Sequence, residues 1–244
     1  MIYCNLKGGL GNMLFQIAAT IQFSKKLGVE YSFPNLLTHK RNFDGKSVIP
    51  SYGGFFKNLK NDKPKKNANL ISFPFHYVEM EVEDESIIDG FFQSEKYFKN
   101  AREEILNIFP KYHNFTDRVS VHVRRGDYIG KQKFHNVLPI EYYKKAFTFF
   151  KGKKFLFFSD DIEWCKKTFV GQEFEFHKTR GDMADIAIMS SCEHNIVANS
   201  SFSWWGAWLN QNDNKKVISP SQWVGPALCH LDTKDIHCEE WIKI

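Results

Sequence analysis

The sequence predicts an α/β fold built on parallel sheets, and three observations carry that prediction. Short apolar runs of strand length alternate with helical patterns along the second half of the chain. The chain opens on an apolar segment, a glycine loop and a long amphipathic stretch. With 244 residues, 43% of them hydrophobic, it is long enough for one large domain or two modest ones, each with a buried core. Strands that alternate with helices form parallel sheets with right-handed crossovers.

The N-terminal part begins with strand, loop and helix patterns. Residues 3–6 fit a strand, and three closely spaced glycines then form a loop. Apolar residues at helical spacing predict a helix over about 12–27, and Gly28 fits its C-cap. In the rest of this part we expect strands at 29–33 and 86–90, a solvated loop at 61–69 and a helix at 95–109.

A break at 110–117 is the expected domain boundary, which divides the chain into residues 1–115 and 116–244. Beyond it the alternation of strands and helices becomes regular. The expected strands are 119–123, 155–158, 174–176, 195–198 and 217–218, and the expected helices are 140–150, 162–169, 182–192 and 204–210. In such sheets ligands bind beyond the carboxyl ends of the strands, so that edge is where we expect the site.

Composition excludes several protein classes. A net charge of +5 and 25% charged residues are ordinary for a globular protein and exclude a disordered chain. The mild positive charge suits an anionic small ligand. The one dense lysine cluster, at 57–66, lies in an expected loop, and this placement disfavours a nucleic-acid-binding protein. No apolar run reaches 18 residues and no signal peptide is visible, so we expect a cytoplasmic protein whose five scattered cysteines are reduced.

The first expected strand end with unusual chemistry is the run SVHVRRGDY. Two adjacent arginines directly after a buried strand are costly unless an anion meets them, and a guanidinium binds phosphate oxygens in a bidentate manner. In strand geometry His122 and Arg124 share one face while Arg125 points elsewhere, so we expect one arginine to bind the ligand and the other to be structural. The alternative is an internal salt bridge through Asp127.

The second such end is the run ANSSFSWW. Its serines and asparagine offer hydrogen-bond donors at a junction of strand and helix, and a helix that begins near Ser203 adds a favourable dipole for an anion. The alternative is ordinary N-capping by Ser203, and the tryptophans that follow are expected in the core. Two loops suited to anions at one sheet edge favour a phosphate ligand.

Acidic residues and metal ligands give weaker patterns. Asp182 fits a helix cap, and Asp185, in the first turn, fits either a structural role or hydrogen bonds from a guanine edge. The adjacent Asp160 and Asp161 are expected to be loop and cap residues. Histidines and cysteines gather near the C-terminus without a C-x-x-C pair, so no metal site is expected.

At this point the combined motifs resemble the α-1,2-fucosyltransferases of glycosyltransferase family 11, of the bacterial type. The runs that carry the resemblance are GGLGNMLFQIA, GFFQSEKYF, HVRRGDY and DMADIAIMSSCEHNIVANSSFSWWGAWLN, with FFSDDIEWCK and KVISPSQWV in support. They extend over nearly the whole chain. The chain looks short for the family. The shortness affects the expected identity of the acceptor more than that of the donor.

The resemblance implies a GT-B-like fold of two facing Rossmann-like domains, with the acceptor on the N-terminal side and the donor site in the C-terminal domain. It implies inverting transfer of L-fucose from GDP-β-L-fucose to a glycan hydroxyl, the 2-OH of a galactoside in the first instance, without a metal or other cofactor. The implied partners are therefore GDP-fucose and a glycan acceptor, with peripheral contact at the inner face of the membrane as a further option.

The resemblance also assigns site residues. Arg124 is implied to hold the diphosphate, His122 and Asp185 to face the guanosine, and Asn12 to reach the transferred sugar. Ser201, Phe202 and Ser203 are implied to complete the phosphate site. We take Asp127 as the candidate general base because it lies close to Arg124 in sequence. The alternative function is a non-catalytic nucleotide-sugar or anion-binding module of the same fold.

Overall fold

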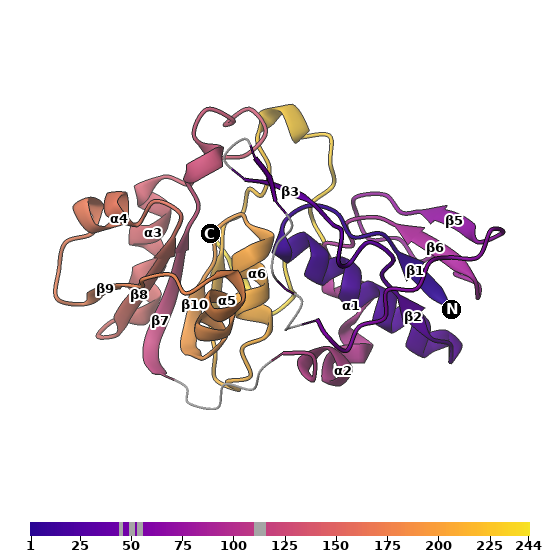
Figure 1. The fold of residues 1–244 in the computed structure, drawn as a ribbon. Helices are drawn as coiled ribbons and strands as arrows, with labels where there is room; N and C mark the ends of the chain where they lie inside the picture. Colours follow the sequence, from indigo (N-terminus) through magenta and orange to yellow (C-terminus); the bar gives the residue numbers. More distant parts are fainter. Residues whose placement is uncertain (44–45, 49–51, 53–55, 110–115) are drawn as a thin grey trace. The chain divides into compact units, whose positions relative to one another are not determined.

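The computed structural model describes residues 1–43, 46–48, 52, 56–109 and 116–244 (Figure 1). The chain divides into two compact units. The N-terminal unit comprises Met1–Lys111 with Lys234–Ile236, and the C-terminal unit comprises Tyr112–Thr233 with His237–Ile244. Residues 110–115 of the predicted boundary at 110–117 lie outside the described residues, and Thr116 and Asp117 already belong to a strand. The assignment of 1–115 and 116–244 as functional domains stays a prediction.

The N-terminal unit contains a four-stranded parallel sheet in the order β2-β1-β6-β5. Its strands are β1 (Ile2–Cys4), β2 (Tyr31–Ser32), β5 (Asn69–Ser72) and β6 (Ser86–Asp89), and β3 (Arg41–Phe43) and β4 (Lys46–Val48) form a separate antiparallel pair. Helix α1 (Leu10–Leu27) begins two residues before the predicted start, since Gly9 is its N-cap. Its C-cap is Gly28 in the left-handed conformation, at φ 65°, as predicted.

The helix predicted over 95–109 is wrong in most of its length. The segment instead forms the 3₁₀ turns η1 (Glu95–Tyr97) and η2 (Lys99–Ala101) and the short helix α2 (Arg102–Leu106). Tyr97 and Phe98 are adjacent and both buried: the Tyr97 ring packs against those of Phe23 and Phe92, and the Phe98 ring packs against Phe15. Neighbouring residues of a continuous helix point about 100° apart, so the departure from helical geometry at Phe98, with φ −148° and ψ 7°, lets both rings enter the core.

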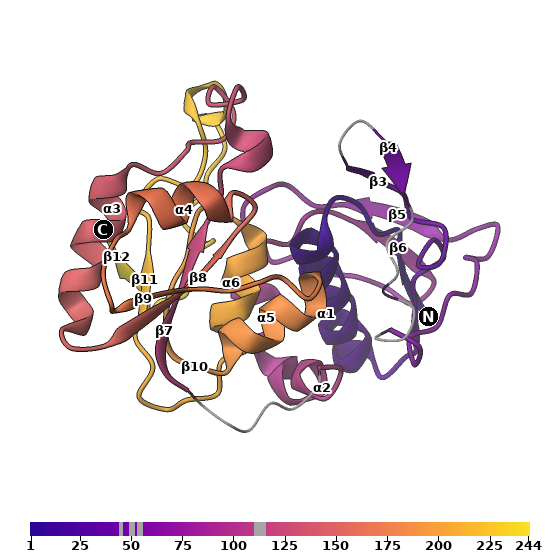
Figure 2. The same ribbon diagram turned by 60° about the vertical axis from the view of Figure 1, so that its left-hand side comes forward.

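The C-terminal unit contains a six-stranded parallel sheet in the order β12-β11-β10-β7-β8-β9. The strands are β7 (Thr116–Val123), β8 (Lys154–Ser159), β9 (Phe174–Phe176), β10 (Cys192–Ile196), β11 (Val217–Ser219) and β12 (Ile242–Lys243). Helices α3 (Ile140–Phe147) and α4 (Ile162–Thr168) cover one face, and α5 (Asp182–Ser190) and α6 (Ser201–Trp208) cover the other (Figure 2). The prediction of an α/β fold with Rossmann-like units is confirmed.

Strand alternation in β7 decides which side chains reach which face. Val119, Val121 and Val123 belong to the apolar core that packs under α3 and α4. The residues between them face α5 and α6: the Asn195 Nδ2 donates to Ser120 Oγ at 2.7 Å and to the Met189 carbonyl of α5 at 2.9 Å. The period of two therefore directs His122, at the carboxyl end of the strand, to the α5 and α6 face.

Three predicted helices differ from the observed ones at their ends. The helix predicted over 182–192 stops at Ser190, and Cys192 is the first residue of β10. The reason is local, because the hydroxyls of Ser190 and Ser191 each donate to a carbonyl of the last turn at 2.8 Å. Helix α6 begins at Ser201, before the predicted start, and α3 ends at Phe147, followed by the 3₁₀ turn η4 (Thr148–Phe150).

Candidate active site

The carboxyl edge of the six-stranded sheet gathers most of the predicted site residues. Because all six strands are parallel, the segments that follow β7, β8, β9 and β10 leave the sheet at this one edge. Seven of the eight predicted residues lie in this unit, at or directly after those strand ends: His122, Arg124, Asp127, Asp185, Ser201, Phe202 and Ser203. Asn12 lies in the N-terminal unit.

Arg124 is held by two carboxylates at the end of β7. Its Nη2 lies 2.5 Å from Asp127 Oδ1, and its Nη1 lies 3.0 Å from Asp160 Oδ2. The guanidinium also lies over the ring of Tyr128, 5.4 Å from the centroid. The salt bridge through Asp127 that the sequence left as an alternative is therefore present, yet the Arg124 side chain is about one quarter exposed rather than buried. An anionic ligand at Arg124 has to compete with these carboxylates.

Arg125 is the structural arginine of the pair. It points to the other face of the sheet, where its guanidinium lies 3.8 Å from the ring centroid of Trp164 in α4, and its Nε donates to Asp161 Oδ2 at 3.2 Å. Asp161 is also the N-cap of α4, because its Oδ1 accepts a hydrogen bond from the Trp164 amide. The prediction of a loop and cap role for Asp161 is confirmed.

His122 is a buried histidine with an unused ring nitrogen. Its exposed fraction is 4%, its ring centroid lies 5.6 Å from that of Phe202, and its Nδ1 has no hydrogen-bond partner among the described residues. Burial, assisted by the positive charge of Arg124, lowers the pKa of His122 to about 3. The imidazole is therefore neutral at physiological pH, and a buried polar atom without a partner is uncommon in proteins.

The turn from β10 into α6 uses Ser203 as an internal support. The hydroxyl of Ser203 accepts from the Ala198 amide at 3.2 Å and donates to the Ser200 carbonyl at 3.3 Å. The N-cap is Ser200, so the alternative of an N-cap at Ser203 is wrong. Ser201 and Phe202 are partly exposed in the first turn, whereas the tryptophans that follow are buried, as expected for the core: Trp204, Trp205 and Trp208.

Asp185 supports the segment between β9 and α5. Its Oδ1 accepts hydrogen bonds from His177 Nε2 at 3.0 Å and from the Arg180 amide at 3.1 Å, and its Oδ2 accepts from Thr179 Oγ1 at 2.6 Å. A carboxylate accepts about four hydrogen bonds, so the protein already uses most of this capacity. The N-cap of α5 is Gly181, and the cap predicted at Asp182 is wrong.

Asn12 belongs to helix α1 rather than to the glycine loop before it. Its Oδ1 accepts a hydrogen bond from Gln93 Nε2 at 2.7 Å. Gly8 has a φ of 82°, and a Cβ added there would lie 2.6 Å from Asn12 Nδ2, so only glycine permits this close approach. Gln93 lies in one of the motif runs, but no local pattern predicts this contact, because the two residues are 81 positions apart.

A second group that sequence reasoning missed ties the loop after β7 to the rest of the edge. The Tyr128 hydroxyl donates to the Asn199 carbonyl at 3.1 Å. The Asn199 Nδ2 in turn donates to the carbonyls of Asn136, at 3.0 Å, and Trp223, at 3.1 Å. Asn199 lies inside a motif run, but its partners are distant in sequence, so no local pattern reveals this role.

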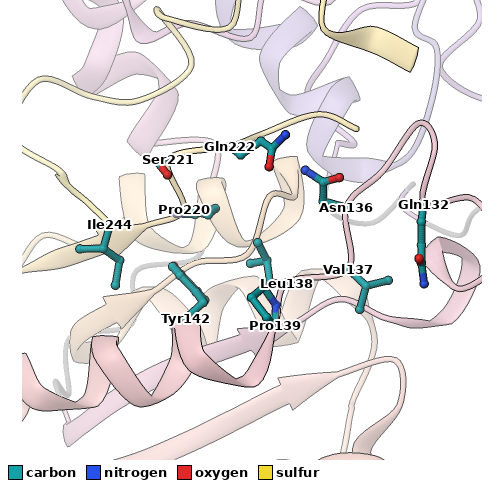
Figure 3. Close-up of a pocket in the computed structure, with 10 residues that line it drawn as sticks. All are labelled: Gln132, Asn136, Val137, Leu138, Pro139, Tyr142, Pro220, Ser221, Gln222 and Ile244. Carbon is teal, nitrogen blue, oxygen red and sulfur yellow. The ribbon is translucent and has the colours of Figure 1, made fainter. Parts of the chain in front are cut away.

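A pocket of about 340 Å³ lies next to this loop, on the α3 side of the sheet (Figure 3). The segment leading into α3 forms one wall, and the residues after β11 form the other. Its lining residues are Gln132, Asn136, Val137, Leu138, Pro139, Tyr142, Pro220, Ser221, Gln222 and Ile244. No predicted site residue is among them.

We expect Gly225→Ala to loosen the loop that follows Asp127. A Cβ at Gly225 would lie 2.6 Å from the carbonyl oxygens of Gln132 and Lys133. These are backbone atoms, so the clash can be relieved only by a shift of the chain itself. The hydrogen bond from the Gly225 amide to the Phe134 carbonyl, now 2.8 Å, would be lost. The free energy of unfolding should fall by ~1 to 3 kcal/mol in a urea titration. Gly9→Ala, where an added Cβ meets nothing within 4 Å, is the control.

Two of the histidines near the C-terminus, which the sequence offered as metal ligands, have other partners. His194 stacks on Phe150 at 4.9 Å and accepts a hydrogen bond from the Lys216 amide, and His237 Nδ1 lies 3.1 Å from Ser219 Oγ. Burial raises the pKa of the Cys192 thiol to about 11, which opposes the thiolate that zinc requires. The expectation of a metal-free enzyme stays a prediction.

A parallel α/β sheet with arginine and serine side chains at its carboxyl edge is the usual setting for a ligand site in this fold class. A sequence model of glycosyl transferase family 11 matches residues 56–244. The chain belongs to glycosyl transferase family 11, and the predicted resemblance and the prediction of a glycosyltransferase are confirmed.

Bacterial and mammalian glycosyltransferases are similar to this chain. The alpha-1,2-colitosyltransferase of Escherichia coli is 28% identical and covers 100% of this chain and 99% of its own. The O-antigen biosynthesis glycosyltransferase WbnK of Escherichia coli is 27% identical, over 91% of this chain and 94% of its own. The galactoside 2-alpha-L-fucosyltransferase Sec1 of Mus musculus is 29% identical, over 52% of this chain and 38% of its own.

Within the described residues, no helix combines the length and the apolar character that a membrane crossing requires.

Proposed function

We propose that the chain transfers L-fucose from GDP-β-L-fucose to a hydroxyl of a glycan acceptor, the 2-OH of a galactoside in the first instance, with inversion and without a metal. The observation that carries this proposal is Arg124 at the carboxyl end of a parallel strand in a member of family 11. Two residues before it lies His122, whose Nδ1 has no hydrogen-bond partner in the described part of the chain. The names of the relatives, which include O-antigen synthesis and galactoside fucosylation, support a glycan acceptor.

Arg124 has the central role in this reaction. As GDP departs, negative charge grows on the β-phosphate while the sugar becomes positively charged at C1. A fixed guanidinium stabilises that charge more strongly in the transition state than in the ground state. The N-terminus of α6, with Ser201 in its first turn, supplies backbone amides and a favourable dipole for the same group.

The remaining predicted residues are proposed to bind the donor around this centre. The neutral His122 ring and the partly exposed Phe202 ring form an uncharged surface that fits the nucleoside. Asp185 has capacity for about one further hydrogen bond from guanine, and Ser203 holds the turn that carries Ser201. Asn12 remains the residue proposed to contact the sugar, and Asp127 the general base.

Colitose is a second candidate donor sugar, and one observation favours it. The relative that covers the whole chain is named an alpha-1,2-colitosyltransferase. Colitose is the 3-deoxy form of L-fucose, so a site that forms no hydrogen bond with the 3-hydroxyl accepts both sugars. Competition between GDP-fucose and GDP-colitose for one acceptor measures this preference directly.

The experiment that tests the proposal is a turnover assay. Purified chain is incubated with GDP-fucose and a panel of galactosides, some free and some lipid-linked, and released GDP and product mass are measured. The proposal predicts acceptor-dependent GDP release, a product heavier by one fucose, and an α-configured linkage by NMR. GDP binding without turnover across the panel would favour the non-catalytic module.

Removal of divalent cations should leave this activity unchanged. The proposed positive charge at the diphosphate comes from Arg124, so the rate in excess EDTA is expected within about 2-fold of the untreated rate. Loss of activity that Mg²⁺ or Mn²⁺ restores would contradict the metal-independent mechanism and would make Asp160 and Asp161 candidate ligands.

A further inference from the structure

The two carboxylates on Arg124 are held very differently. Asp160 is fixed on both oxygens: Oδ2 contacts Arg124 Nη1 at 3.0 Å, and Oδ1 accepts from the backbone amide of Arg125 at 2.9 Å. It also packs closely against Gly126, where an added Cβ would lie 2.6 Å from Asp160 Oδ2. The Asp160 side chain is one quarter exposed.

Asp127 is held only loosely by comparison. It lies in the 3₁₀ turn η3 (Gly126–Tyr128), and its side chain is 52% exposed. Among the described residues, the Asp127 side chain forms one hydrogen bond, which Oδ1 accepts from Arg124 Nη2 at 2.5 Å. An exposed ion pair of this kind contributes little stability, whereas the Asp160 pair is reinforced by a backbone hydrogen bond.

A diphosphate that binds the terminal nitrogens of Arg124 in a bidentate manner competes with these partners for the guanidinium. The guanidinium presents its donors as a planar fork, and Asp127 and Asp160 now occupy its two terminal nitrogens. The partner that yields is the one with fewer bonds and more solvent around it, because water replaces its interactions most completely. That partner is Asp127.

We propose that Asp160 is the positioning residue of Arg124 and that Asp127 is its exchangeable partner, released by the donor diphosphate to act as the general base. This inference rests on the proposed function. In the step that follows, the acceptor oxygen forms a bond to C1 of the sugar, and the bond from C1 to the phosphate oxygen breaks. GDP leaves with the electron pair, and the acceptor hydroxyl proton passes to the Asp127 carboxylate.

The consequence is that donor binding creates the base. Before the donor arrives, the Asp127 carboxylate is bonded to Arg124 Nη2 and is not available to an acceptor hydroxyl. After exchange, the phosphate takes over Arg124, and the released carboxylate is available to accept the proton of the acceptor hydroxyl. The donor must therefore bind before the acceptor hydroxyl can be activated.

The two aspartates then have opposite effects on GDP affinity, which calorimetric titration of GDP measures. Asp127→Asn removes the competing charge, so GDP should bind about 2- to 5-fold more tightly, the scale of one exposed ion pair. Its kcat should nevertheless fall by ~10²-fold or more, as expected for loss of a general base, with no rise in the donor KM.

Asp160→Asn retains a side-chain oxygen that accepts the hydrogen bond from the Arg125 amide, but it removes the negative charge that fixes Arg124. GDP should therefore bind about 10-fold more weakly. Gly126→Ala, which crowds Asp160 Oδ2 while the carboxylate is retained, should weaken GDP binding in the same direction. Glu163→Gln is the control, because it removes an exposed carboxylate paired with Lys166 in the same unit and should leave GDP affinity unchanged.

Each outcome is decisive. Equal or weaker GDP binding by a folded Asp127→Asn variant, or unchanged binding by Asp160→Asn, overturns the exchange while the proposed function stands. If the wild-type chain binds no GDP, the proposed function fails and this inference fails with it. Thermal melts of all four variants establish that each one is folded.

Discussion

Arg124→Ala should lower kcat by at least ~10²-fold, the scale of one lost preorganised donor to a developing oxyanion. GDP affinity should fall as well, because the same guanidinium binds the diphosphate in the ground state. The fold should be preserved, since the side chain is partly exposed and its two ion pairs lie at the surface. Steady-state kinetics with GDP-fucose and calorimetry with GDP measure the two effects separately.

Two further variants make this prediction specific. Arg124→Lys keeps the charge but loses the planar fork, so it should recover only part of the lost activity. Arg118→Ala is the matched control, because Arg118 is also ion-paired in this unit, with Glu175 and Asp117, but at the amino-terminal end of β7. Activity close to wild type in a folded Arg124→Ala variant would refute the assignment.

The second large effect is a loss of stability in mild acid. Burial lowers the pKa of His122 to about 3, and burial with the charge of Lys243 lowers the pKa of His237 to about 4. In the unfolded chain both are near 6.5, so the unfolded state binds more protons as the pH falls below that value. The stability from these neutral histidines is complete above pH 6.5 and is lost progressively toward pH 3.

At pH 4.5 this linkage should cost ~2 to 3 kcal/mol for His122 and somewhat less for the partly exposed His237. Together these costs are a substantial part of the ~5 to 15 kcal/mol that stabilises a typical protein. Urea titrations at pH 7 and pH 4.5 measure the total loss, which includes the carboxylates.

The His122→Phe variant isolates the histidine. It should match the wild type at pH 7, because Nδ1 loses no hydrogen bond to any residue that the structure describes, and should retain ~2 kcal/mol more at pH 4.5. An identical acid dependence in the two proteins would contradict the assignment of a buried, neutral His122.

Much of the C-terminal unit was predictable because its signals are local. The apolar runs at 119–123, 155–158 and 174–176 each fall on a parallel strand, and the edge rule then directs attention to the segments that follow them. Alternation along β7 also placed His122 and Arg124 on one face and Arg125 on the other. These predictions needed no knowledge of tertiary contacts.

The features that sequence reasoning missed depend on residues far apart in the chain. The Asp160 contact with Arg124 spans 36 positions, and the contact of Asn12 with Gln93 spans 81. The 95–109 segment has helical spacing, but burial of the adjacent Tyr97 and Phe98 overrides that preference. The serine pattern of α6 suggested a cap at Ser203, and only the backbone geometry shows that Ser200 has this role.

A crystal structure of the chain with GDP tests the central claim most directly. We predict that the pyrophosphate lies within hydrogen-bond distance of Arg124 and of the first-turn amides of α6. Asp160 should remain in place and Asp127 should be displaced from Nη2. GDP bound at another edge of the sheet, or an Arg124 that keeps both carboxylates with the nucleotide present, would contradict the account.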